Sequence, residues 1–64
     1  MKVRDLIKVL EADGWQLAVI RGSHRQFTHP AKTGKVTVAG HASAELAPGT
    51  LNNILKQAGL KDKA

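Results

Sequence analysis

The feature that most constrains the fold of this sequence is a pair of stretches, one near each end of the chain. In both, apolar residues recur at helical spacing. Each places apolar side chains at the i, i+3, i+4 and i+7 positions of one helix face, which predicts helices over residues 3–13 and 48–58. A helix with one apolar face must bury it against another layer, so the two helices need a common surface. The apolar positions are Val3, Leu6, Ile7 and Leu10 in the first stretch and Leu51, Ile54, Leu55 and Ala58 in the second.

Three short runs between these helices can supply that surface. Residues 15–20 and 24–29 are separated by a Gly-Ser turn signal, and Pro30 and Thr33-Gly34 precede a third run at 35–39. Three consecutive strands with short connections favour an antiparallel meander. We therefore expect an α+β fold of order α-β-β-β-α, with a three-stranded antiparallel sheet and both helices on one face, as in double-stranded RNA-binding domains. Residues 40–47 are expected to form a loop, and residues 61–64 to fray.

Composition narrows the class of protein. A chain of 64 residues predicts one domain, residues 1–64, and the absence of cysteine excludes disulfides and thiolate metal ligands. Ten Lys/Arg against five Asp/Glu give a net charge of +5, which suits either plain solubility or a polyanionic partner such as nucleic acid. The N-terminal segment is interrupted by charges, and no apolar run approaches about 20 residues. We therefore expect a cytoplasmic protein without a membrane partner.

The segment RGSHRQF at residues 21–27 raises the question of what His24 does. In a strand over residues 24–29, alternate side chains point to opposite faces. Phe27 is the only large apolar side chain of that strand and should face the helices, which puts His24, Gln26 and Thr28 on the open face. Arg21 and Lys35 are expected to lie near His24. Two further residues share the parity of Phe27 and are expected at the strand ends, namely Arg25 and His29.

Several roles for His24 remain open from the residues alone. The acids are scattered and two of the three histidines have opposite parity, so we expect no metal site and no cofactor. No acid stands at a spacing that suggests a Ser-His-Asp triad. An imidazole between two arginines could act as a proton-transfer group on RNA, whose 2′-hydroxyl supplies the nucleophile. Spacing alone nevertheless favours an ordinary surface histidine.

Four segments of the chain form a specific pattern when taken in order, namely LIKVLEADGW at 6–15, GSHRQFTHP at 22–30, GKVTVAGH at 34–41 and LAPGTLNNILKQAGL at 46–60. The most specific features are Gly-Ser-His with an aromatic residue three positions later and the Leu-x-x-Gly-Thr motif. These segments cover almost the whole chain and resemble the HicA family of bacterial toxins, also described as YcfA-like.

The resemblance implies a fold like that of double-stranded RNA-binding domains, mRNA interferase activity and a HicB antitoxin partner. In that family the histidine of the Gly-Ser-His motif is catalytic, and here it is His24. Members often carry a second histidine where this chain has Arg25, and Val-Pro where it has Ala39-Gly40 before His41. The roles of His29 and His41 stay open. The RNA contacts that we expect besides His24 are Arg21, Arg25, Gln26, Thr28 and Lys35.

The leading hypothesis is thus the toxin of a type II toxin–antitoxin system, an endoribonuclease that cleaves mRNA with one catalytic histidine. The alternative is a non-catalytic RNA-binding module of the same fold, and a third is a regulatory protein that acts only through its partner. The first hypothesis requires the imidazole of His24, whereas the second requires only the lysines and arginines. Trp15 is expected to be a core residue rather than a base-stacking one.

Overall fold

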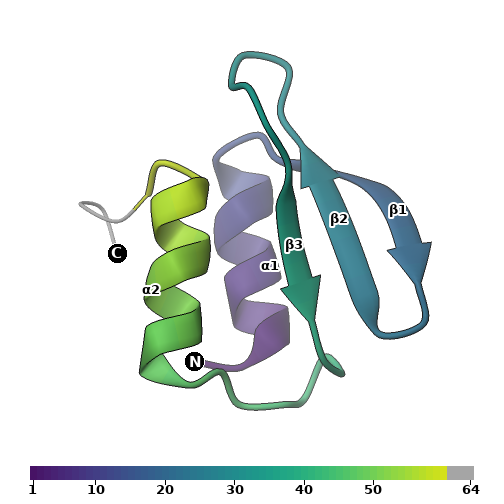
Figure 1. The fold of residues 1–64 in the computed structure, drawn as a ribbon, viewed down its shortest axis with the longest axis vertical. Coiled ribbons are helices and arrows are strands. Elements are labelled where there is room, and N and C mark those ends of the chain that lie inside the picture. Colours follow the sequence, from purple (N-terminus) through teal and green to yellow (C-terminus); the bar gives the residue numbers. More distant parts are fainter. Residues whose placement is uncertain (61–64) are drawn as a thin grey trace.

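The computed structural model describes residues 1–60, to which all structural statements below refer, and the expected fraying of residues 61–64 lies outside this range. The predicted order α-β-β-β-α is confirmed (Figure 1). The first strand begins and ends one residue later than expected, because Trp15 precedes it and belongs to the core. The elements are α1 (Val3–Ala12), β1 (Gln16–Arg21), β2 (His24–Thr28), β3 (Val36–Ala39) and α2 (Pro48–Gln57).

The three strands form one antiparallel sheet in the order β1-β2-β3, as a meander requires. Phe27 of β2 pairs with Val36 of β3, and both side chains are buried on the same face. Along β3 the side chains alternate between buried and exposed, so only one face of the sheet is covered. The apolar stripes of both helices join Phe27 and Val36 in one core, which confirms that the helices share that face.

The core contains six of the eight residues that the helical spacing singled out, and the other two, Ile7 and Leu51, are partly buried and pack against it. Trp15 is 2% exposed, so its expected place in the core is confirmed. Leu60 closes the far end of α2, where its N–H donates to the carbonyl of Leu55 over 2.8 Å. Burial of these side chains supplies the main driving force for folding. The buried apolar residues are Val3, Leu6, Leu10, Trp15, Phe27, Val36, Val38, Ile54, Leu55, Ala58 and Leu60.

The loop that follows β3 closes the amino-terminal end of α1. The N–H of Val3 donates to the carbonyl of Ala44 over 2.9 Å, and the N–H of Arg4 donates to the carbonyl of Ala42 over 3.0 Å. These are two of the N–H groups that a helix leaves without a partner of its own. The loop over residues 40–47 is therefore tied to α1 by backbone hydrogen bonds, and its conformation depends on that helix.

β1 stands apart from the rest of the fold because the helices do not reach it. Figure 1 shows it at the edge of the sheet farthest from α2, and all six of its residues are exposed. Leu17, Val19 and Ile20 are 45%, 38% and 59% exposed. The pairing with β2 is irregular between Leu17 and Val19, where β1 holds one residue more than its partner. The alternation of residues in the sequence predicted the strand, but it did not predict that the helices would leave the strand exposed.

Neither helix within residues 1–60 has the length and apolar character needed to cross a lipid bilayer.

Candidate functional site

The open face of the sheet carries the polar side chains that the strand parity predicted. His24 is exposed and Phe27 is buried, so the assignment of the two faces is confirmed. Gln26 pairs with the exposed Thr37 of β3, and Thr28 pairs with Gln16 of β1. Paired residues of an antiparallel ladder share a face, so hydroxyl and amide groups line this side of the sheet.

His24 begins β2, directly after the two-residue turn Gly22-Ser23. Gly22 has a φ of +57°, which suits the first central position of a tight hairpin turn and which other residues rarely adopt. The residue opposite His24 across the hairpin is Arg21. Their side chains therefore project from neighbouring positions on the open face, where Cβ atoms of paired residues are about 5 Å apart. The turn fixes the backbone of both residues and leaves their functional groups exposed.

Arg25 belongs to the other face of the sheet. Its Nη1 donates to the carbonyl of Gly40 over 3.2 Å, and its side chain is half-buried. The guanidinium thereby holds the start of the loop after β3 against the start of β2. From the sequence we expected Arg25 at a strand end with its charge directed outward. The structure shows that its guanidinium also has a hydrogen-bond partner, the carbonyl of Gly40.

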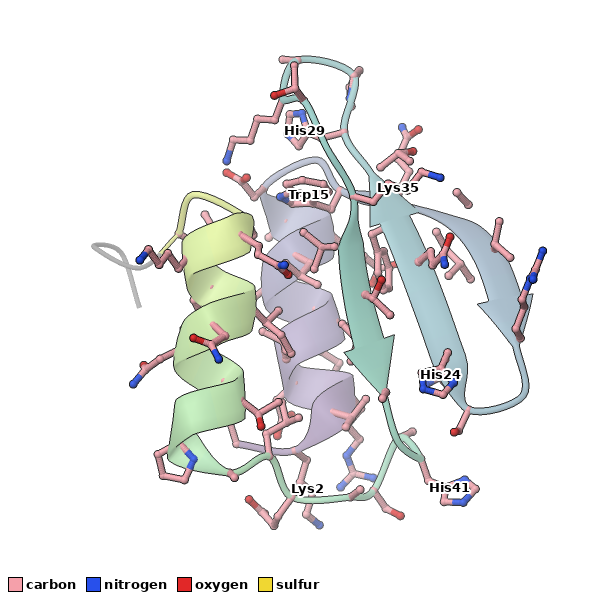
Figure 2. All side chains as sticks on the ribbon, viewed as in Figure 1. Lys2, Trp15, His24, His29, Lys35 and His41 are labelled. Atoms are coloured by element: carbon pink, nitrogen blue, oxygen red, sulfur yellow. The ribbon has the colours of Figure 1, made fainter. Side chains whose placement is uncertain are left out.

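Lys35 lies at the opposite end of the sheet from His24, so the expectation that the two are close was wrong. Phe27 pairs with Val36, which places Lys35 beside the end of β2 that carries Thr28. Figure 2 shows Lys35 and His24 at the two ends of the sheet. Thr28 follows His24 by four positions, which in a strand is roughly 13 Å. Residue spacing could not reveal this, because it depends on the register between β2 and β3.

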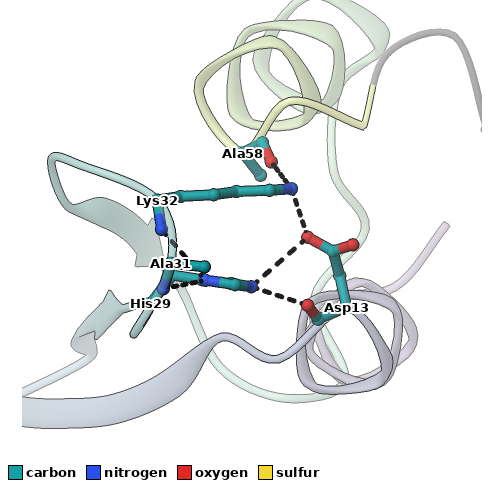
Figure 3. Close-up of polar contacts among 5 residues, drawn as sticks. All are labelled: Asp13, His29, Ala31, Lys32 and Ala58. Atoms are coloured by element: carbon teal, nitrogen blue, oxygen red, sulfur yellow. Dashed lines mark hydrogen bonds and ion pairs between the residues drawn. The ribbon is translucent and has the colours of Figure 1, made fainter.

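His29 is committed to a cluster that joins three parts of the fold (Figure 3). Its Nδ1 accepts the N–H groups of Ala31 and Lys32 over 3.0 and 3.2 Å, so the ring carries its proton on Nε2. Nε2 donates to the carbonyl of Asp13 over 2.7 Å. The side chain is 9% exposed, and its ring packs edge-on against Trp15 with centroids 5.2 Å apart. His29 is thus a largely buried residue whose two ring nitrogens both form hydrogen bonds within the fold.

The same cluster connects the two helix ends. Lys32 donates to the carboxylate of Asp13, just beyond α1, and to the carbonyl of Ala58 over 2.9 Å, at the end of α2. A cation beside the last carbonyls of a helix is favourable. Gly14 completes the arrangement, because a Cβ at this position would lie 2.8 Å from Nε2 of His29 and φ is +104°.

His41 lies at the same end of the molecule as His24. Figure 2 shows both rings at that end, and both residues are exposed. The N–H of Gly40 donates to the carbonyl of Ser23 over 3.1 Å, which links the segment before His41 to the turn before His24. The sequence showed a histidine soon after the third predicted strand. Spacing alone could not indicate that this segment would lie beside the turn before His24.

The described surface offers neither a metal site nor a pocket. Among residues 1–60, no three histidines, aspartates or glutamates come together as metal ligands would. The same residues form no concave pocket of the kind that encloses small molecules. An exposed sheet face with hydrogen-bonding groups and a flanking arginine is instead accessible to an extended polymer.

Comparison with models of known protein families identifies a family for this chain. The sequence model of the family described as the HicA toxin of bacterial toxin-antitoxin systems matches residues 3–60, which include every helix and strand of the fold. No curated protein matches the chain significantly.

Proposed function

The chain belongs to the HicA toxin family, and from this premise we propose that it is an endoribonuclease that cleaves mRNA and arrests growth. The observation that carries the proposal is the pairing of His24 with Arg21 on an open, polar sheet face. An imidazole can take up and release a proton near neutral pH, and a guanidinium binds phosphate through a planar fork of donors. The two groups suit a phosphodiester that lies across the hairpin end.

RNA brings its own nucleophile to such a site. His24 removes the proton of a 2′-hydroxyl, whose oxygen attacks the adjacent phosphorus while the bond from phosphorus to the 5′-oxygen breaks. Arg21 stabilises the charge that accumulates on the phosphoryl oxygens during this step. The products are a 2′,3′-cyclic phosphate and, once the departing 5′-oxygen has gained a proton, a 5′-hydroxyl. No metal or cofactor is needed for this reaction.

Binding of the RNA strand is mainly electrostatic in this proposal. The net charge of +5 attracts the phosphate backbone, and Gln26 and Thr28 offer hydrogen bonds along the face. Lys35 contacts the RNA strand at the end of the sheet that is distant from His24. The chain has only two aromatic residues, Trp15 and Phe27, and both are buried, so stacking on bases contributes little.

Regulation requires a partner that covers the hairpin end. Toxins of this family act in the cytoplasm beside an antitoxin, and we propose a HicB-like acidic protein that occludes His24 together with Arg21. Opposite charge speeds the association of two such proteins. Protection of the His24 ring from diethyl pyrocarbonate in the complex, but not in the free toxin, supports occlusion. Equal modification in both states contradicts it.

The test of catalysis is His24→Ala, measured for folding, RNA binding and RNA cleavage on one preparation. The ring is exposed, so the variant should melt within about 0.5 kcal/mol of wild type. Loss of one proton-transfer group should slow cleavage about 100- to 10,000-fold, while binding through Arg21 persists. Lys8→Ala, an exposed change on α1 behind the sheet, serves as the matched control.

Normal cleavage by folded His24→Ala would reject the catalytic role and favour a non-catalytic RNA-binding module, which the same polar face could form. A substrate with one 2′-deoxynucleotide at the mapped cleavage position tests the nucleophile. Wild-type protein should leave that position uncut. Cutting there would indicate attack by water.

A further inference from the structure

The backbone on both sides of His41 is held firmly although its ring is exposed. The N–H of Gly40 donates to Ser23, and the carbonyl of Gly40 accepts from Nη1 of Arg25 over 3.2 Å. The carbonyl of His41 itself accepts the N–H of Ala44 over 2.9 Å, in the loop that is tied to α1. A fixed backbone limits the positions that the ring of His41 can reach, which is one requirement of a proton-transfer site.

The ladder between β2 and β3 limits the distance between His41 and His24. His24 pairs with Ala39, and His41 follows two residues later. Cα atoms of an antiparallel pair are about 5 Å apart, and two extended residues add at most about 7 Å. The Cα atoms of the two histidines are therefore separated by at most about 12 Å. Figure 2 shows their side chains at the same end of the molecule.

The carboxylates near this end already have partners among residues 1–60. Asp5 accepts the backbone N–H of Lys2 over 3.3 Å, and Glu45 pairs with the amino group of Met1 over 3.2 Å. Asp13 and His29 belong to the cluster at the other end of the fold. Among the described residues, the imidazole near His24 that has no side-chain partner is thus His41.

We propose that His41 is the second proton-transfer group of this site, an inference that rests on the proposed ribonuclease activity. Cleavage needs an acid as well as a base, because the departing 5′-oxygen must gain a proton as its bond to phosphorus breaks. His24 accepts the proton of the 2′-hydroxyl, and His41 in its protonated form gives one to the 5′-oxygen. The step leaves His24 protonated and His41 neutral, and exchange with water restores both.

The experiment compares two RNA oligonucleotides that contain a cleavage position mapped with the wild-type protein. One is ordinary RNA, and the other carries sulfur in place of the 5′-oxygen at that position. A thiolate departs without a proton, so an acid is needed for the first substrate and not for the second. Ser43→Ala, an exposed change in the same loop, is the matched control.

We expect His41→Ala to cleave ordinary RNA about 100- to 10,000-fold more slowly than wild type. It should cleave the sulfur-containing RNA at nearly the wild-type rate, whereas His24→Ala should be slow on both. Unchanged cleavage of ordinary RNA by His41→Ala, or equal slowing on both substrates, overturns the proposal. If His41→Ala fails to fold, His41→Gln gives the same comparison with a ring-sized polar side chain.

Failure of the inference differs from failure of the proposed function. Wild-type protein that binds RNA but yields no cleavage position in the mapping step would reject the ribonuclease itself. Wild-type cleavage that depends on His24 but not on His41 would reject only the second proton-transfer group.

Discussion

His24 and His29 are five positions apart, yet their surroundings differ. His24 projects from an exposed hairpin end opposite Arg21. His29 uses both ring nitrogens to hold the β2–β3 loop against the end of α1. Sequence parity distinguished the two faces correctly, but it gave no sign of the cluster around His29, whose members are far apart in the chain.

Replacement of His29 by alanine should destabilise the protein, because it removes three hydrogen bonds and an edge-on ring contact with Trp15. We expect a loss of about 2–4 kcal/mol in the free energy of unfolding, measured by urea denaturation. His24→Ala is the matched control and should change it by less than about 0.5 kcal/mol. Equal effects of the two substitutions would show that the cluster contributes little.

At the scale of elements, β1 differs from β2 and β3 because it has no helix behind it. Its outer edge has no neighbouring strand among residues 1–60, and its apolar side chains are exposed on both faces. Open edges with apolar side chains favour pairing with other chains. The irregularity between Leu17 and Val19 is one of the features by which proteins limit such pairing.

Amide hydrogen exchange should reveal this difference directly. N–H groups of β1 that point away from β2 should exchange at nearly the rate of an unstructured peptide, whereas those of Val38 and Leu55 should require global unfolding. The measurement is exchange followed by NMR in the free protein. Protection of the outer edge of β1 that rises with protein concentration would instead indicate pairing between two copies of the chain.

The elements also show how far sequence can predict such a fold. The two helical stripes and the position of Phe27 specified the layers and the open face, because both signals are local periodicities. The place of Lys35 and the exposure of β1 depend on the strand register and on how far the helices extend over the sheet. The strand register and the extent of the helices over the sheet are features of tertiary structure, and no local periodicity in the sequence predicts them. The proximity of His41 to the His24 turn was missed for the same reason.

At the scale of the whole molecule, the excess of positive charge should dominate RNA binding. The affinity for a single-stranded RNA should fall steeply as salt rises, with a slope of about −0.7 for each phosphate contact in a double-logarithmic plot. Arg21→Gln should reduce the slope by about one contact, because its guanidinium flanks the open face. Lys8→Gln should leave it unchanged, since α1 lies behind the sheet. Affinity that is constant from low to high salt would contradict an electrostatic interface.

The closure of α1 by the loop after β3 also has a consequence for the time at which the protein becomes active. His24 and Arg21 meet through a two-residue turn, whereas the position of His41 depends on the contacts of Val3 and Arg4 with Ala44 and Ala42. Contacts between distant residues form later than local ones, because a longer stretch of chain must be ordered first. During synthesis the hairpin can therefore form while the loop is still inside the ribosome. If the proposed ribonuclease activity needs His41, we expect the nascent chain to stay inactive toward its own message until the loop over residues 40–47 has emerged.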